Sequence, residues 1–173
     1  MWIFGYGSLI WRPDFDFVER RDGYVRGWAR RFYQGSTDHR GVPGDPGRVA
    51  TLVEKSDAEV WGRAYRLAPD SVDEVLARLD HREKGGYVRR QVEVLRPGDA
   101  PTCSALVYLA TADNPHWQGE ATPTEIARQI EQAHGPSGPN REYLLELAES
   151  LRQMGADAPH VFSIEEALLG LAN

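Results

Sequence analysis

One glutamate is placed where its carboxylate can carry out acid–base chemistry. Glu83 stands in the segment R-E-K-G-G-Y at 82–87, where a predicted helix ends and a glycine pair begins. Such a junction lets a side chain point into a cleft, where a carboxylate can take a proton from one group and return it to another. The chain has 26 acidic residues, so the alternative is an ordinary solvated carboxylate.

The N-terminal segment F-G-Y-G-S-L at 4–9 follows the first predicted strand directly. A strand that ends in a glycine-rich turn exposes several backbone N–H groups in one place, and these donors can hold a carboxylate or a phosphate. The alternative is an ordinary tight turn. No histidine or lysine stands at a recognised spacing to activate Ser8 as a nucleophile, so we expect its hydroxyl to donate to a bound carboxylate.

Two further polar segments are candidates for substrate contacts. The segment S-T-D-H-R-G at 36–41 can bind substrate or form a solvated turn, and Arg40 is its cationic candidate for a second anionic group. In G-P-S-G-P-N-R-E-Y at 135–143, glycine and proline fix a connector, and Asn140 can cap the helix that follows. Tyr143 lies on the apolar face of that helix, so it either packs in the core or turns its hydroxyl toward a cleft.

Composition argues against several classes of site and partner. The single cysteine, Cys103, allows no internal disulfide, and the five histidines include no pair spaced like metal ligands on one helix face. We therefore expect no metal and no cofactor. The formal net charge of -6 argues against a nucleic-acid partner. Because the N-terminus has no basic segment and no long apolar stretch, we expect no signal peptide, no membrane partner and a cytoplasmic protein.

The elements that must position these residues run as strands first and helices afterwards, with one helix inserted. Apolar patterns predict strands over 2–4, 24–34, 48–55, 59–67, 88–95 and 103–110. The third and fourth of these can pair as a hairpin. Apolar residues at helical spacing predict helices over 70–82, from 122 to about 135, from 140 to about 155, and a short one capped near Ser163.

This order of elements predicts an α+β fold. The chain has 173 residues, 41% of them hydrophobic and 27% charged, which suits one globular domain over 1–173. The part from about 155 is expected to be peripheral. Several antiparallel strands can close into a small barrel with helices on its outside.

Four segments occur in an order and at a spacing typical of a known family. They are F-G-Y-G-S-L-I-W at 4–11, R-R-F-Y-Q-G-S-T-D-H-R-G-V-P at 30–43, R-E-K-G-G-Y at 82–87 and G-P-S-G-P-N-R-E-Y-L at 135–144. Through them the chain resembles the ChaC-like family of glutathione-specific γ-glutamylcyclotransferases, from Met1 to about Arg152. The resemblance implies a γ-glutamylcyclotransferase-like fold, a small mixed β-barrel flanked by α-helices.

The resemblance also implies an activity and its residues. It implies a lyase that converts glutathione into 5-oxoproline and Cys-Gly through attack of the α-amino group, with Glu83 as general acid/base. The implied γ-glutamyl-binding loop consists of Ile3, Phe4, Gly5, Tyr6, Gly7, Ser8 and Leu9. We further expect Tyr143 and Arg40 to contribute to substrate binding, and Glu83 to be partly buried so that its carboxylate is a stronger base.

Two alternatives to this activity stay open. In the first, the protein is a cyclotransferase for other γ-glutamyl amino acids or γ-glutamylamines. In the second, it is a non-catalytic sensor of a γ-glutamyl ligand. In each case the partner is a small molecule, and the protein is a monomer or a homodimer.

Overall fold

The computed structural model of the protein describes residues 1–83, 85–98 and 100–171. The chain divides into two compact units, each made of two stretches: 1–29 with 52–115, and 30–51 with 116–173. We call them the first and the second unit and describe each by itself. That the whole chain acts as one domain remains a prediction.

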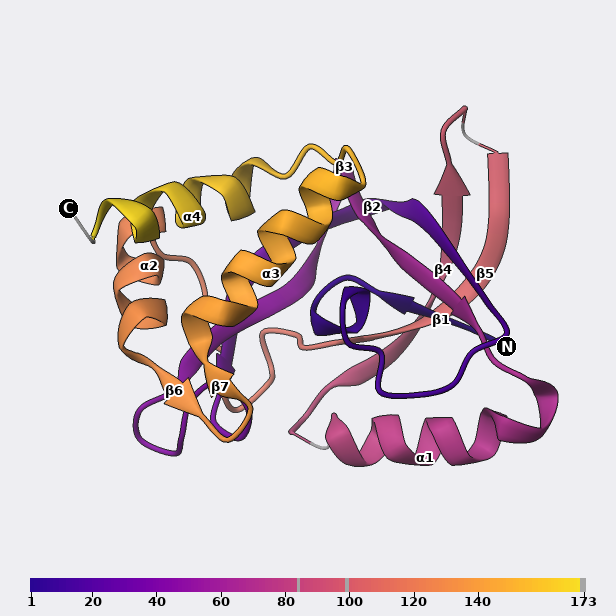
Figure 1. The fold of residues 1–173 in the computed structure, drawn as a ribbon, viewed down its shortest axis with the longest axis horizontal. Coiled ribbons are helices and arrows are strands. Elements are labelled where there is room, and N and C mark those ends of the chain that lie inside the picture. The colour runs from indigo at the N-terminus through magenta and orange to yellow at the C-terminus, as the bar shows by residue number, and fades with distance from the viewer. Residues whose placement is uncertain (84, 99, 172–173) are drawn as a thin grey trace. The chain divides into compact units, whose positions relative to one another are not determined.

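Five strands form a closed barrel in the order β1-β3-β2-β4-β5 (Figure 1). They are β1 (Trp2–Gly5), β2 (Glu19–Ser36), β3 (Gly47–Arg66), β4 (Val88–Arg96) and β5 (Ala100–Leu109). Strand β1 pairs antiparallel with β3 but parallel with β5, so the barrel is mixed. Together with the four α-helices of the described residues, it confirms the expected α+β fold with a small mixed barrel.

The two strands that were expected to pair as a hairpin form a single strand, β3. The sequence predicted two strands over 48–55 and 59–67, whereas the structure has one strand of 20 residues. The polar residues 55–57 resembled a turn, but this stretch contains neither glycine nor proline and continues the strand with exposed side chains.

Helix α1 (Val72–Arg82), preceded by the short 3-10 helix η2 (Pro69–Ser71), is held by the core of the first unit. That core is formed by buried side chains from strands, loop and helix: Ile3, Phe15, Tyr65, Leu67, Val75, Leu79 and Tyr108. Burying each such side chain contributes roughly 1.5–3 kcal/mol. Because Val75 and Leu79 anchor α1 to this core, the C-terminal end of α1 has a fixed place beside β1, β3 and β5.

The second unit contains α2 (Pro123–Gln132), α3 (Asn140–Gln153) and α4 (Pro159–Gly170), drawn in orange to yellow in Figure 1. Helix α2 has the predicted capping box, in which the Thr122 hydroxyl accepts the N–H of Glu125 and the Glu125 carboxylate accepts the N–H of Thr122. The connector predicted as a loop forms a small ribbon of β6 (His134–Gly135) and β7 (Gly138–Pro139).

Helix α4 begins five residues before the position expected from a cap at Ser163. Ser163 does not cap it, because the helix starts at Pro159 and the Ser163 hydroxyl donates to the carbonyl of His160. Apolar residues Val161, Ile164 and Leu168 are buried, so this last segment supplies core side chains to the second unit.

Asn140 does not cap α3, which begins after Pro139 without a side-chain cap. Its fully buried side chain instead accepts the N–H of Arg48 at 2.7 Å and donates to the Arg48 carbonyl at 2.9 Å. Asn140 therefore connects the start of α3 to the start of β3, two segments that are far apart in the sequence.

The imidazole of His160 is held neutral within the second unit. Its Nε2 atom accepts the N–H of Phe32 at 3.0 Å, which requires an unprotonated nitrogen. The pKa of His160 is lowered from 6.5 to about 4. Burial is the largest cause, and the positive charges of Arg31, Arg30 and Arg48 add to it.

Acid should therefore weaken the fold through His160. The unfolded chain takes up a proton at this residue near pH 6.5 and the folded protein near pH 4, so the free energy of unfolding falls as the pH drops through this window. The loss amounts to up to about 3 kcal/mol, measured by urea denaturation at neutral and acidic pH. The variant H160Q can accept the Phe32 N–H without titrating, and an equal acid loss in both proteins would contradict this assignment.

Candidate active site

The chain turns sharply where β1 meets the 3-10 helix η1 (Ser8–Ile10). A Cβ added to Gly5 would lie 2.7 Å from the Cβ of Leu9, so this return of the chain requires glycine. The N–H of Ile10 donates to the Gly7 carbonyl at 2.9 Å. The N–H groups of Gly7, Ser8 and Leu9 have no backbone acceptor among the residues that the structure describes. These three N–H groups remain candidates for the anion-binding donors that the sequence predicts.

Buried side chains anchor this loop. Residues 3–7 are buried, and Ser8 and Leu9 are half-buried. The Tyr6 hydroxyl donates to the carbonyl of Tyr108 on β5 at 2.8 Å, which commits its proton inside the first unit. Tyr6 thus holds the loop in place, and its hydroxyl is not positioned to donate to a substrate oxygen.

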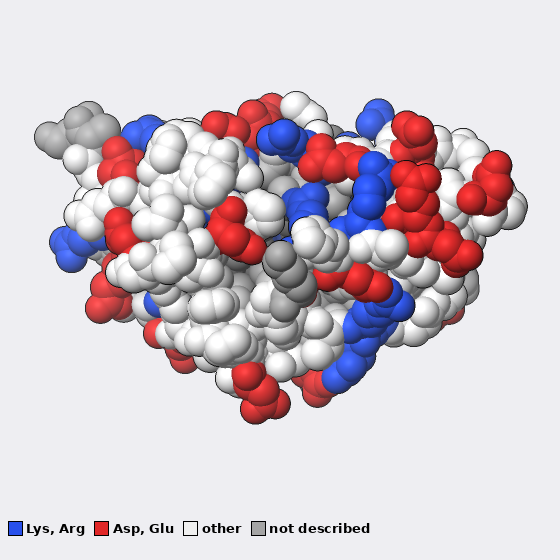
Figure 2. All heavy atoms as spheres, turned by 90° about the horizontal axis from the view of Figure 1, so that it is seen from below, with Lys and Arg blue, Asp and Glu red and all other residues white. Residues whose placement is uncertain are grey.

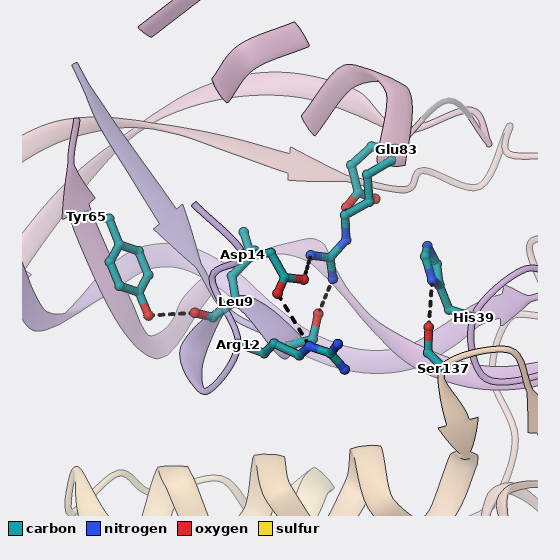
Figure 3. Close-up of polar contacts among 9 residues, drawn as sticks. Leu9, Arg12, Asp14, His39, Tyr65, Glu83 and Ser137 are labelled. Carbon is teal, nitrogen blue, oxygen red and sulfur yellow. Dashed lines mark hydrogen bonds and ion pairs between the residues drawn. The ribbon is translucent and has the colours of Figure 1, made fainter. Parts of the chain in front are cut away.

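Tyr65 on β3 fixes the far end of the loop, a role that no sequence motif indicated. Its hydroxyl lies 2.6 Å from the Leu9 carbonyl and 3.1 Å from the Ile10 carbonyl, and Figure 3 shows the bond to Leu9. Burial raises the pKa of the Tyr65 hydroxyl, which keeps it a neutral donor. Its ring packs edge-on against Phe15 with centroids 5.6 Å apart, so ring and hydroxyl act on different neighbours.

Replacing Tyr65 with phenylalanine should loosen the loop with little damage to the fold. The ring contact stays, while the bonds to Leu9 and Ile10 are lost, at a cost of about 1 kcal/mol in unfolding free energy. We expect kcat/KM for the substrate to fall roughly three- to tenfold because the loop donors lose their alignment. The control Y24F removes a distant hydroxyl that lies 3.4 Å from the Arg96 carbonyl. Equal activity of Y65F and Y24F would show that Tyr65 does not align the loop.

Glu83 lies at the C-terminal cap of α1, in the same unit as the loop. Its N–H donates to the Leu79 carbonyl at 2.8 Å, and its side chain is 19% exposed, which confirms the expected partial burial. The Glu83 Oε1 atom lies 3.5 Å from Nε of Arg82, whose Nη2 donates to the Ser8 hydroxyl oxygen at 2.6 Å. Arg82 therefore bridges the candidate general base and the candidate binding loop.

Asp14 and Arg12 complete this polar cluster, as the dashed lines of Figure 3 show. Asp14 Oδ2 lies 3.5 Å from Arg82, and Asp14 Oδ1 lies 3.4 Å from Arg12. Asp14 has a φ of 57°, in the left-handed region that aspartate tolerates better than most residues. The sequence analysis predicted no role for Arg82, although Arg82 stands next to Glu83 in the segment R-E-K-G-G-Y. Asp14 carried no local signal.

Arg40 and Tyr143 belong to the second unit, where each has its own partners. The Arg40 side chain is 5% exposed, donates to the Pro139 carbonyl at 3.0 Å and lies 3.5 Å from Glu142. The Tyr143 hydroxyl accepts the N–H of Ala50 at 3.3 Å, and the residue is buried. These contacts fit a packing role, and substrate binding by either residue remains a prediction.

Within the second unit, the polar segment at 36–41 is held by close backbone packing against glycines of neighbouring segments. A Cβ on Gly135 would lie 2.3 Å from the His39 carbonyl oxygen, and one on Gly47 would lie 2.4 Å from the Arg40 carbonyl oxygen. The Nδ1 atom of His39 also lies 3.1 Å from the Ser137 hydroxyl oxygen (Figure 3). The glycines in these segments thus serve loop-to-loop packing.

Neither a cluster of metal ligands nor a helix suited to crossing a membrane occurs in the described ranges 1–83, 85–98 and 100–171. No group of three or more His, Cys, Asp or Glu residues there is arranged to hold a metal ion. No described helix has the length and apolar character needed to span a membrane. On the face drawn in Figure 2, Lys and Arg side chains lie among Asp and Glu side chains.

Solved structures share this fold. A crystal structure of a glutathione-specific γ-glutamylcyclotransferase from yeast matches with a TM-score of 0.89 and 31% identity, over 98% of this chain and 96% of that chain. A second structure, described as a γ-glutamyl cyclotransferase, matches with a TM-score of 0.58 and 17% identity, over 95% of this chain and 85% of that chain. The fold is therefore that of the γ-glutamylcyclotransferases.

Sequence comparison gives the family within that class. The family model described as "ChaC-like protein" matches residues 1–169. The glutathione-specific γ-glutamylcyclotransferase 1 of Danio rerio is 48% identical, over 98% of this chain and 89% of that protein. The human protein of the same name is 45% identical, over 97% of this chain and 78% of that protein. The chain belongs to the ChaC-like family.

Proposed function

We propose that the protein is a glutathione-specific γ-glutamylcyclotransferase, an enzyme that converts glutathione into 5-oxoproline and Cys-Gly. The family and the names of its relatives support this activity. The observation that carries the proposal is geometric: a loop with N–H donors and a half-buried carboxylate, Glu83, are bridged by Arg82 through contacts of 2.6 Å and 3.5 Å.

The reaction is an attack of the substrate on itself. The α-amino nitrogen of the γ-glutamyl group forms a bond to that group's γ-carbonyl carbon, and the amide bond to cysteine breaks. The attacking nitrogen loses one proton before the attack and a second once the ring bond has formed, and the departing amine of Cys-Gly takes up two protons and leaves as an ammonium. Nucleophile and electrophile belong to one molecule, so the protein needs to supply positioning and proton transfer.

The loop from Ile3 to Leu9 supplies the positioning. The N–H groups of Gly7, Ser8 and Leu9 bind the α-carboxylate, which holds the flexible γ-glutamyl chain folded back on itself. Because the Tyr6 hydroxyl donates to the Tyr108 carbonyl, a backbone N–H of this loop also stabilises the tetrahedral oxyanion.

Glu83 supplies the proton transfer. As a carboxylate it takes the proton of the α-ammonium, and as a carboxylic acid it returns the proton to the leaving amine. Tyr143 and Arg40 stay predicted substrate contacts, as do a cytoplasmic location and a monomeric or homodimeric state.

A substrate panel tests the proposal against its two alternatives. Purified protein is incubated with glutathione, γ-glutamyl-alanine and γ-glutamyl-lysine, and 5-oxoproline is quantified. We expect glutathione to have by far the highest kcat/KM. Comparable turnover of all three would favour a broader cyclotransferase, and protection against thermal unfolding without any product would favour a sensor.

A further inference from the structure

Arg82 stands next to Glu83 and contacts the loop that follows β1. It is the last residue of α1, with a side chain that is 25% exposed, and its guanidinium reaches the loop that follows β1. Its one short contact is the bond of 2.6 Å from Nη2 to the Ser8 hydroxyl oxygen. Its contacts with Asp14 and Glu83 are both longer, at 3.5 Å.

The hydrogen-bonding capacity of this cluster is not used up. A guanidinium has five N–H donors, and among the described residues Arg82 makes only three contacts, so donors remain for a ligand. Arginine donates only, so the Ser8 oxygen is the acceptor in their bond. The hydroxyl proton of Ser8 is therefore left to donate to another acceptor.

The charges of the cluster match one kind of headgroup. Arg82 carries a positive charge and Glu83 a negative charge, with Nε and Oε1 3.5 Å apart. An α-amino acid group has a carboxylate and an ammonium on one carbon, so its two charges are as close together as those of this pair. A ligand of this type can replace the ion pair with two new ones, carboxylate to Arg82 and ammonium to Glu83.

We propose that Arg82 is a substrate-binding residue that receives the α-carboxylate of the γ-glutamyl group, together with the Ser8 hydroxyl and the loop N–H groups. This inference rests on the proposed function and deepens it. Binding of the carboxylate by Arg82 places the α-ammonium beside Glu83, the group that must accept its proton. Asp14, itself in contact with Arg12 at 3.4 Å, lies 3.5 Å from the Arg82 guanidinium and helps to fix its position.

The test combines one change in the enzyme with one change in the substrate. The substrate variant is a glutathione analogue in which the glutamyl α-carboxylate is a carboxamide and the α-amino group is unchanged. The enzyme variant is Arg82→Gln. The control is Arg78→Gln on the same helix, a side chain that is 54% exposed and lies 3.9 Å from Glu74.

The four combinations of enzyme and substrate give a thermodynamic cycle. For the wild type, we expect kcat/KM to be about 10- to 100-fold lower with the carboxamide than with glutathione. For R82Q we expect a similar loss with glutathione and less than about threefold further loss with the carboxamide, because the contact is already absent. The control R78Q should discriminate like the wild type.

Each other result overturns the assignment. If the losses from R82Q and from the carboxamide multiply, Arg82 has a merely structural role. If the wild type uses both substrates equally well, no cation recognises the α-carboxylate. Should thermal unfolding show that R82Q does not fold, the neutral variant Arg82→Met replaces it, and discrimination as strong as in the wild type overturns the proposal.

The proposed function fails separately from this inference. Absence of 5-oxoproline from the wild-type reaction with glutathione overturns the activity itself and the role of Arg82 with it. Normal production of 5-oxoproline from glutathione, with losses that multiply, leaves the activity in place and removes only the role of Arg82.

Discussion

Replacement of Glu83 by glutamine lowers kcat for 5-oxoproline formation by about 10²- to 10⁴-fold, the range expected for loss of a general acid/base. Glutamine keeps the size and polarity of the side chain but cannot accept the proton of the α-ammonium. The Glu83 N–H still donates to the Leu79 carbonyl, so the end of α1 is preserved. Steady-state kinetics with glutathione, together with a thermal unfolding curve, measure the effect.

The control for this variant is Glu74→Gln on the same helix. The Glu74 side chain is 75% exposed and lies 3.9 Å from Arg78, away from the polar cluster. We expect E74Q to keep wild-type kcat within a factor of about two, since surface substitutions of this kind have small effects. A near-normal rate in E83Q would remove Glu83 from the mechanism.

Replacement of Gly5 by alanine has the second large expected effect. The new Cβ would lie 2.7 Å from the Leu9 Cβ and 3.2 Å from the Leu9 carbonyl carbon, so the turn must open. A shift of about 1 Å in the donors that orient a substrate can cost on the order of 10²-fold in rate, and we expect kcat/KM to fall by about this factor. The overpacked turn also lowers the free energy of unfolding by roughly 1–3 kcal/mol.

The matched control for Gly5→Ala is Gly170→Ala. A Cβ at Gly170, the last residue of α4, meets no atom within 4 Å. Kinetics and unfolding of G170A should match the wild type. If G5A retains wild-type kcat/KM, the loop does not need its compact conformation for activity, and the proposed grip on the γ-glutamyl group is wrong.

Local patterns in the sequence were sufficient for much of the fold. Continuous apolar runs located β1 and β5, and apolar periodicity located β4 and α1. The capping box located the start of α2, since it depends on Thr122 and Glu125 alone. Strand β3 was misread because its exposed middle has the polarity of a turn, and only its pairing with neighbouring strands stabilises it as one element.

The candidate site was predictable as separate parts but not as an arrangement. Glycine at 5 and 7 indicated the turn, and the helix end indicated the position of Glu83. Their proximity through Arg82 depends on a contact between residues 74 positions apart, which the packing of α1 against β1, β3 and β5 creates. The role of Tyr65 was not predictable for the same reason, because its hydroxyl donates to carbonyl groups 56 and 55 positions away in the sequence.

The central claim is that the amide bond is broken by the substrate's own amine and not by water. The most direct measurement is the reaction of the purified protein with glutathione in water enriched in ¹⁸O, with mass analysis of both products. The mechanism predicts equal amounts of Cys-Gly and 5-oxoproline, with no solvent oxygen in the 5-oxoproline. Glutamate carrying ¹⁸O would show hydrolysis and contradict the cyclisation.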